Sequence, residues 1–221
     1  IRLSLVGSEM CIRDRKEKKD NLEVPRIGIR FHIPQDMNIV EYFGRGPEEN
    51  YIDRNAGSMV GRYKTIADSM YVDYVRPQEN GHRTDTRWVV LSDKSGRGLL
   101  VQADKTIGFN ALRNTIEDFD AEDSSRPYQW RNRSPKEIEN HDLDEAKNAM
   151  RKMTHVNDII PRDFVEVSVD MKQQGVAGYD SWGAKVQPGY TIPANQNYEW
   201  GFTFVPIRAK ADVDKSLRYD Y

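Results

Sequence analysis

The segment from Gly175 to Gly183 combines the residue types that most directly suggest ligand chemistry. It reads Gly-Val-Ala-Gly-Tyr-Asp-Ser-Trp-Gly, so an aromatic ring, a carboxylate, a hydroxyl and an indole follow two glycines. Glycine permits backbone angles that other residues refuse, which predicts a tight turn or a close backbone approach. A strand pattern ends just before this segment and no helical period follows it, so we expect a loop at a strand end.

Trp182 is the residue of this loop that is best suited to bind a sugar. Its indole can stack on the C–H face of a sugar ring while neighbouring polar groups bind the hydroxyls. We expect Asp180 and Ser181 to orient the loop rather than to touch the sugar, because short polar side chains after a glycine turn usually bond nearby backbone. The residues alone leave open a structural alternative, in which Trp182 is buried and fills the end of a β-sandwich.

Alternating apolar residues predict the strands that position this loop. Ile27, Ile29, Phe31 and Ile33 repeat with a period of two, and the same pattern over 164–171 leads into the loop. Further strand-like segments lie at 39–43, 71–76, 86–91, 99–103, 190–192 and 198–204. Short strands separated by turns are typical of antiparallel sandwiches and barrels, so we predict an all-β fold.

The sequence also predicts two core tryptophans, one or two short helices and a polar network. Trp88 and Trp200 lie within predicted strands, and we expect both in the core. Ser134 and Pro135 resemble a helix start, and apolar residues at helical spacing follow, which predicts one or two short surface helices up to residue 153. The stretch 48–54 carries carboxylates beside an arginine, and we expect a fixed network of charge-assisted bonds rather than ligand contacts.

Composition and motifs exclude several classes of function. The 221 residues carry 33 basic and 35 acidic side chains, and no basic stripe with interleaved aromatics indicates a nucleic-acid binder. No apolar run is long enough for a membrane span. Nucleotide-binding glycine loops, zinc-ligand spacings and serine-nucleophile elbows are missing, so no metal ligand is assigned. The single cysteine, Cys11, cannot form an internal disulfide.

The ends of the chain differ from its middle. Residues 1–15 keep neither a strand nor a helix period and resemble translated sequencing adapter, so we expect them to be non-native. Residues 16–24 are interpreted as a linker, 25–206 as the sandwich, and 207–221 as a loose charged tail.

Several stretches, taken together, resemble the C-terminal small-chain domain of the large bacterial β-galactosidases of glycoside hydrolase family two. They fall in the order of that family and lie at 25–28, 44–54, 77–81, 87–88 and 175–183. The resemblance implies an antiparallel supersandwich of the galactose mutarotase type. It also implies that Trp182 matches the tryptophan that this domain contributes to the active site, where it stacks on the substrate.

The resemblance further implies a retaining β-galactosidase with two glutamates about 5 Å apart. In the family these glutamates lie in a (β/α)₈ barrel together with Mg²⁺ and Na⁺ sites, so no catalytic residue is assigned in this chain, and Glu48, Glu49 and Glu79 are not candidates. The implied partners are a galactoside such as lactose, the remaining domains of the same polypeptide and, in a homo-oligomer, further copies. The compartment, bacterial cytoplasm or periplasm, stays open.

Two departures from the family pattern and two alternatives remain. The chain is expected to begin partway into the family's domain, which removes the first strands of the sandwich and exposes edges. Ala177 stands where the resemblance implies glycine, which matters if that position needs a positive φ. The alternatives are a non-catalytic carbohydrate-binding sandwich and a mutarotase acting on free aldoses. A mutarotase needs a His–Glu acid/base pair, and the spacing singles out none.

Overall fold

The computed structural model describes residues 3–6, 23–74, 79–119, 156–180 and 182–217. Contacts divide the chain into two compact units. The first comprises Ile1–Val72, Asn80–Arg113 and Arg162–Tyr221, and the second comprises Asp73–Glu79 and Asn114–Pro161. All strands named below belong to the first unit, while the second contains the short helices α2 (Ile116–Phe119) and η2 (Val156–Asp158).

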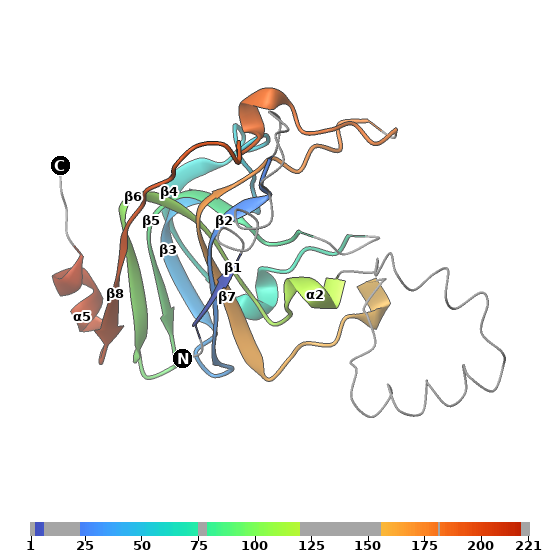
Figure 1. Cartoon of the computed structure of the whole chain (residues 1–221). Helices are drawn as coiled ribbons and strands as arrows, with labels where there is room; N and C mark the ends of the chain where they lie inside the picture. The colour runs from blue at the N-terminus through green and yellow to red at the C-terminus, as the bar shows by residue number, and fades with distance from the viewer. Residues whose placement is uncertain (1–2, 7–22, 75–78, 120–155, 181, 218–221) are drawn as a thin grey trace. The chain divides into compact units, whose positions relative to one another are not determined.

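Within the described residues, the first unit forms one eight-stranded antiparallel sheet (Figure 1). The strands are β1 Leu3–Val6, β2 Arg26–Pro34, β3 Ile39–Gly46, β4 Met59–Ile66, β5 Arg83–Ser92, β6 Gly98–Leu112, β7 Phe164–Gln173 and β8 Phe202–Ile207. Their order is β1-β2-β7-β6-β5-β3-β4, and β8 also pairs with β6. The all-β antiparallel fold that the sequence predicts is therefore confirmed.

The long strand β6 pairs with two different strands, β8 and β7, along its length. Its residues up to Ala103 pair with β8, whereas its residues from Gly108 onward pair with β7. Its register with β5 shifts twice, and such bulges bend a sheet. The rings of Phe31 in β2 and Phe204 in β8 lie 5.4 Å apart although these strands are not neighbours. The sheet thus curves back on itself, as expected of a sandwich.

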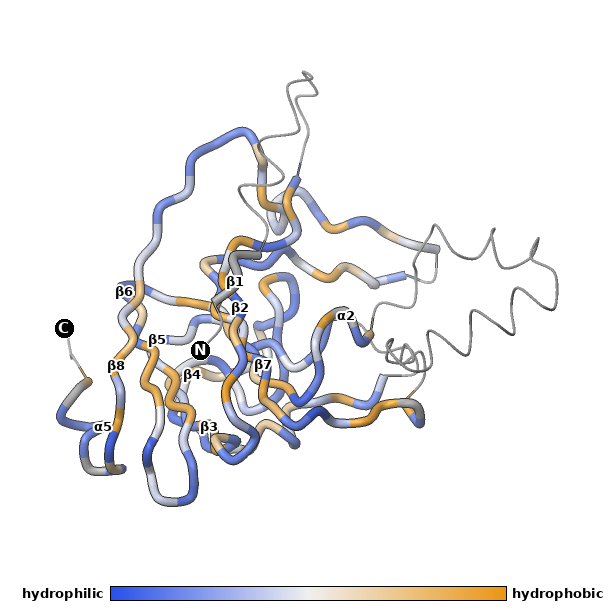
Figure 2. The backbone as a smooth tube through the Cα atoms, turned by 60° about the horizontal axis from the view of Figure 1, so that its bottom comes forward, coloured by the Kyte–Doolittle hydropathy of each residue, from blue (hydrophilic) through white to orange (hydrophobic). Residues whose placement is uncertain are grey.

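Alternating residues of the strands supply the core. Figure 2 shows hydrophobic stretches along β5 and β7. The fully or nearly fully buried apolar side chains include Phe31, Ile33, Val89, Leu91, Val101, Phe109, Val165, Val167 and Val169. Trp88 is 6% exposed, which confirms its predicted place in the core. Trp200 is only partly buried, so its predicted core position is wrong.

The end of the described chain packs on the outer face of the sheet. Helix α5 (Ala211–Ser216) and the residue after it bury Val213 and Leu217 in a cluster with Trp88 and Leu100. The prediction of a loose tail beyond Pro206 is wrong for this segment. Its charged residues occupy the exposed side of a short helix, and two apolar residues four positions apart share the other side.

Other differences concern elements with a weak sequence signal. The edge strand β4 was not predicted, because its residues are mostly exposed and keep no apolar alternation. Residues 71–74 and 190–192 form no strand. Strand β1 lies within residues 1–15, the segment expected to be non-native, and it pairs with β2. The non-native origin of that segment stays a prediction.

The predicted helices at 134–153 lie outside the described residues. No helix in the described residues is long and apolar enough to cross a membrane.

A buried ion pair fixes β2 against β7. Arg26 Nε lies 3.3 Å from Asp170 Oδ2, and both side chains are at least 95% buried. The same guanidinium donates through Nη2 to Gln173 Oε1 at 2.6 Å. Gly28 faces the Asp170 carboxylate, where an added Cβ would clash with Oδ1. The stretch 25–28, which carries part of the family resemblance, therefore has a physical role. Arg26 supplies the positive charge beside Asp170, and Gly28 leaves room for its carboxylate.

Replacing Arg26 with methionine should lower the free energy of unfolding by about 3–5 kcal/mol, because it removes the buried charge that faces Asp170. Urea denaturation of the Arg26→Met variant measures this loss. The matched control is Arg62→Met, whose arginine is 48% exposed beside Glu41 and should contribute about 1 kcal/mol or less. Equal losses in the two variants would contradict the special role of the buried pair.

Candidate functional site

The Trp182 loop, residues 175–190, begins where β7 ends and is fixed at both ends. Gly175 N donates to Tyr190 O at 2.9 Å, and Gln174 N donates to Pro25 O at 2.9 Å. The chain returns through the 3₁₀ turn η3, Pro188–Tyr190. The loop therefore leaves the sheet from a closed base rather than from a free strand end, and it extends beyond the strands in Figure 1.

Asp53 anchors the first turn of the loop from a distant part of the chain. Its Oδ2 accepts a hydrogen bond from Ala177 N at 2.8 Å. A Cβ at Gly175 would clash with the same carboxylate, so glycine is required there for a close approach. This contact joins residues that are 124 positions apart in the sequence. The loop is consequently held by a side chain that no local pattern could identify.

Asp53 is itself part of a hydrogen-bonded stretch. The fully buried Asn50 donates through Nδ2 to Arg45 O at 3.2 Å and to Glu48 O at 3.0 Å. Its Oδ1 accepts from Thr84 N at 2.9 Å and from Thr84 Oγ1 at 2.6 Å. Asn50 therefore holds residues 48–54 through neutral hydrogen bonds, and Asp53 of the same stretch bonds the Trp182 loop, while the expected charge-assisted network of carboxylates and arginine stays a prediction.

The tip of the loop is organised by Asp180. Its Oδ1 accepts hydrogen bonds from Trp182 N at 2.8 Å and from Ala184 N at 3.0 Å. An aspartate that bonds backbone two residues onward forms an Asx turn, which orders a tight loop. Tyr179 contributes a further bond from its hydroxyl to Lys185 O at 3.3 Å. Ser181 lies outside the described residues, so its supporting role stays a prediction.

Ala177 adopts a backbone conformation that favours glycine. Its φ is +54°, within the left-handed region, which costs an L-residue with a side chain about 1–2 kcal/mol. The resemblance implies glycine at this position, and the structure gives the physical reason. The hydrogen bond from Ala177 N to Asp53 helps to offset this cost.

Trp182 itself is exposed to solvent. Its side chain is 93% exposed, and that of Tyr179 on the same loop is 65% exposed. The structural alternative, in which Trp182 fills the end of the sandwich, is therefore wrong for this chain. Two large aromatic side chains of one loop are thus accessible to a ligand.

A buried histidine, His82, lies against Asp170 of β7. The His82 ring stacks on that of Tyr51 at 5.6 Å, and Nδ1 lies 3.8 Å from Asp170 Oδ2. Burial lowers the pKa of His82 well below its usual value, and the charges of Arg26 and Arg83 lower it further. His82 is consequently neutral in the folded protein and acts as a packed, uncharged ring.

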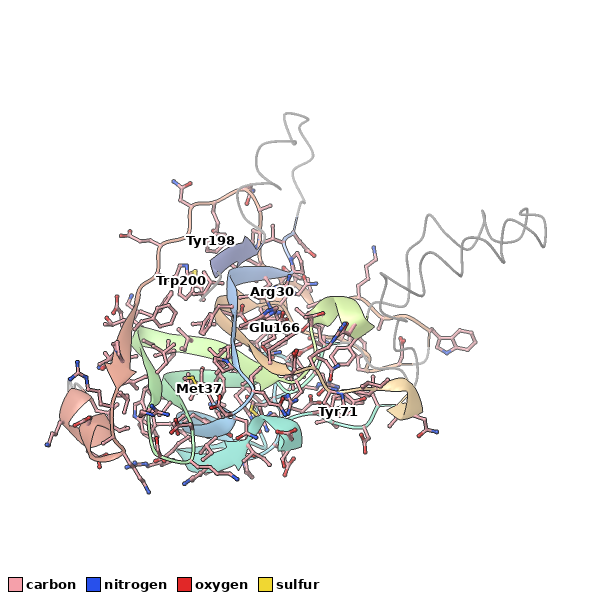
Figure 3. All side chains as sticks on the ribbon, turned by 90° about the horizontal axis from the view of Figure 1, so that it is seen from below. Arg30, Met37, Tyr71, Glu166, Tyr198 and Trp200 are labelled. Carbon is pink, nitrogen blue, oxygen red and sulfur yellow. The ribbon has the colours of Figure 1, made fainter. Side chains whose placement is uncertain are left out.

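One acid/base pair was missed by sequence reasoning. The β2–β7 register places His32 opposite Glu166, and their Nε2 and Oε2 atoms lie 3.0 Å apart. Arg30 Nη1 also lies 3.4 Å from Glu166 Oε1, and Figure 3 shows these two side chains together. The residues are 134 positions apart, so only the strand register reveals the pair. In the described part of the chain, no group of three or more metal-ligating side chains converges.

We expect Asp53→Ala to release the first turn of the Trp182 loop. A hydrogen bond to a charged group contributes about 1.5–3 kcal/mol, so its loss should accelerate hydrogen exchange at Ala177 N by about 10-fold to 150-fold. Exchange measured by NMR tests this, with Asp53→Asn as the control that retains an acceptor oxygen. Unchanged protection of Ala177 N in Asp53→Ala would show that the carboxylate is not the anchor.

His82 should make stability depend on pH. Its folded-state pKa is lowered below 6.5, so as the pH falls through that value the unfolded chain binds a proton that the folded chain refuses, and the free energy of unfolding decreases. We expect His82→Gln to lose this dependence between about pH 7 and about pH 5, whereas His32→Gln retains it. Identical pH profiles for wild type and His82→Gln would refute this assignment.

The comparisons with known proteins agree with this architecture. A family model described as β-galactosidase small chain matches residues 5–204. The β-galactosidase of Priestia megaterium is 35% identical over 185 residues, which cover 84% of this chain and 15% of the relative. The β-galactosidases of Halalkalibacterium halodurans and Streptococcus thermophilus are 31% and 29% identical over 81% and 83% of this chain. The chain spans about 15% of the length of these curated relatives. It belongs to the β-galactosidase small chain family.

Proposed function

We propose that this chain is the C-terminal part of a retaining β-galactosidase of glycoside hydrolase family two, and that Trp182 forms one wall of its substrate site. The observation that carries the proposal is the exposure of Trp182 on an anchored loop, 93% of its side chain being accessible. The substrate class is a terminal β-D-galactosyl residue, as in lactose. The indole stacks on the C–H face of the sugar, and polar groups elsewhere bind the hydroxyls.

The relatives support the proposed reaction class, because they are named β-galactosidases and align with most of this chain. Since the chain spans about 15% of their length, the reacting groups belong to the remainder of the polypeptide. In a retaining glycosidase these groups are two carboxylates about 5 Å apart, one a nucleophile and the other an acid/base. By resemblance they lie in a (β/α)₈ barrel with Mg²⁺ and Na⁺. In this proposal, the partner of the present chain is the barrel of the same polypeptide.

The support around Trp182 suits a stacking surface. Asp180 fixes the backbone of Trp182, and Asp53 fixes the turn that precedes it. Holding a binding group in place before the ligand arrives reduces the entropy lost on binding. The indole can thus present one face to the sugar, while the carboxylates of Asp180 and Asp53 accept hydrogen bonds from backbone amides. In this proposal, Asp180 supports the loop without touching the substrate.

A second candidate is a mutarotase acting on free aldoses, which the His32–Glu166 pair at 3.0 Å favours. Arg30 competes for the same carboxylate, however, and Glu166 is only 6% exposed. A cross-strand pair of this kind ties β2 to β7, so we rank this function below the first. A non-catalytic sugar-binding sandwich is the other alternative, and it predicts binding by the isolated chain without hydrolysis by the full-length protein.

In the full-length enzyme, Trp182→Ala should raise the KM for lactose by about 10-fold to 100-fold. Losing one large stacking surface costs about 1–3 kcal/mol of binding free energy. Trp182→Phe, which keeps a smaller ring, should lie between the wild type and the alanine variant. The control is Met59→Ala, an apolar side chain that is 72% exposed on β4. An unchanged KM for lactose in Trp182→Ala would refute the proposed stacking role of Trp182.

A further inference from the structure

A concave surface that shares no residue with the Trp182 loop lies within the same unit of the fold. A cavity of about 500 Å³ is lined by residues 104–106 of β6, Met171 near the end of β7, and residues 199–201, which precede β8. None of its lining residues belongs to the Trp182 loop. We call this cavity the β6 notch.

The strand pairing explains why the β6 notch exists. One edge of β6 pairs with β8 as far as Ala103 and with β7 from Gly108 onward. Residues 104–107 therefore lie between two strands that follow each other along the same edge. The gap between the two strands leaves a recess in the sheet, and side chains from three elements surround it.

The wall of the β6 notch is held in place before any ligand binds. Asp104 N donates to Gly201 O at 3.1 Å, and a Cβ at Gly201 would clash with the Asp104 carboxylate. Trp200 packs on the Phe202 ring at 4.9 Å. Tyr198, which lies beside Trp200 in Figure 3, donates its hydroxyl to Pro193 O at 2.6 Å. The segment that carries Trp200 is thus tied on both sides.

The residues of the β6 notch combine an apolar surface with hydrogen-bonding groups of both kinds. Trp200 and Met171 supply the apolar wall, while Asp104 and Glu199 accept hydrogen bonds and Lys105 donates them. A flat aromatic face with polar groups around it matches a sugar ring. The volume of about 500 Å³ falls within the range of about 300–1,000 Å³ that is usual for small-molecule sites.

The charges in the β6 notch disfavour other ligand classes. Two carboxylates repel an anion, and Lys105 repels a divalent cation. In the part of the chain that the structure describes, no third metal-ligating side chain joins Asp104 and Glu199. A neutral ligand with several hydroxyls avoids both penalties.

We propose that the β6 notch is a second saccharide-binding site, which holds a pyranose ring against Trp200 with hydrogen bonds to Asp104 and Glu199. This inference does not rest on the proposed role of Trp182, because the two surfaces share no residue. It assigns Trp200 a ligand contact, which also accounts for the partial exposure of an aromatic side chain that the strand pattern places in the core.

The test is an NMR titration of the 221-residue chain with lactose, in which the indole N–H signal of each tryptophan is followed. We expect a saturable shift at Trp200 with a Kd of about 1–10 mM, the range of a shallow site with few contacts. Glu199→Gln should weaken binding at Trp200 at least about tenfold, and Trp200→Ala, which lacks the indole signal, should weaken it as much when the backbone amide signal of Gly201 is followed instead. Glu199 is exposed, so Glu199→Gln tests the site without threatening the fold.

Trp182→Ala is the matched control, because it removes the other aromatic surface and should leave saturation at Trp200 intact. No saturable shift at Trp200, or a shift that is lost only in Trp182→Ala, would overturn the second site. Neither result changes the kinetic test of Trp182 in the full-length enzyme, so failure of one proposal can be told from failure of the other.

Discussion

The arrangement of this fold depends on one buried ion pair, between Arg26 and Asp170. Burying an ionised carboxylate is costly unless a positive group and hydrogen bonds compensate it, and Asp170 is fully buried. Arg26 supplies the positive group and also donates a hydrogen bond to Gln173, the last residue of β7. Burial lowers the pKa of His82, and the charge of Arg26 lowers it further, because a second buried cation beside Arg26 would be repelled. The strand end that leads to the Trp182 loop is thereby fixed.

The exposure of Trp182 follows from how the loop is anchored rather than from its length. Its base is closed by backbone, its first turn is held by Asp53, and its tip is ordered by Asp180. These contacts also sustain the left-handed conformation of Ala177. Strained backbone persists where its surroundings determine it, and it is concentrated at ligand sites. An aromatic side chain on a loop held this way stays exposed instead of collapsing onto the sheet.

The sequence predicts the elements of this protein better than it predicts their contacts. Alternating apolar residues located β2, β5 and β7 and the core position of Trp88, because one buried face imposes a period of two. The apolar alternation is missing in the edge strand β4. At Trp200 the alternation predicts burial, but this side chain lines the cavity beside β6 and is only partly buried. The loop around Trp182 was recognisable from its glycines. Its anchor, Asp53, was not, since a contact across 124 positions depends on tertiary structure.

The two aromatic surfaces have a common origin at the end of β7. Asp170 forms the ion pair with Arg26, Met171 lines the β6 notch, and Gln173 accepts a hydrogen bond from Arg26 just before the Trp182 loop begins. A slip of one residue along β7 would turn each of these side chains to the opposite face of the sheet. The cost of leaving the Asp170 charge away from Arg26 prevents such a slip. One buried pair therefore sets the positions of both surfaces, although neither surface contains either of its residues.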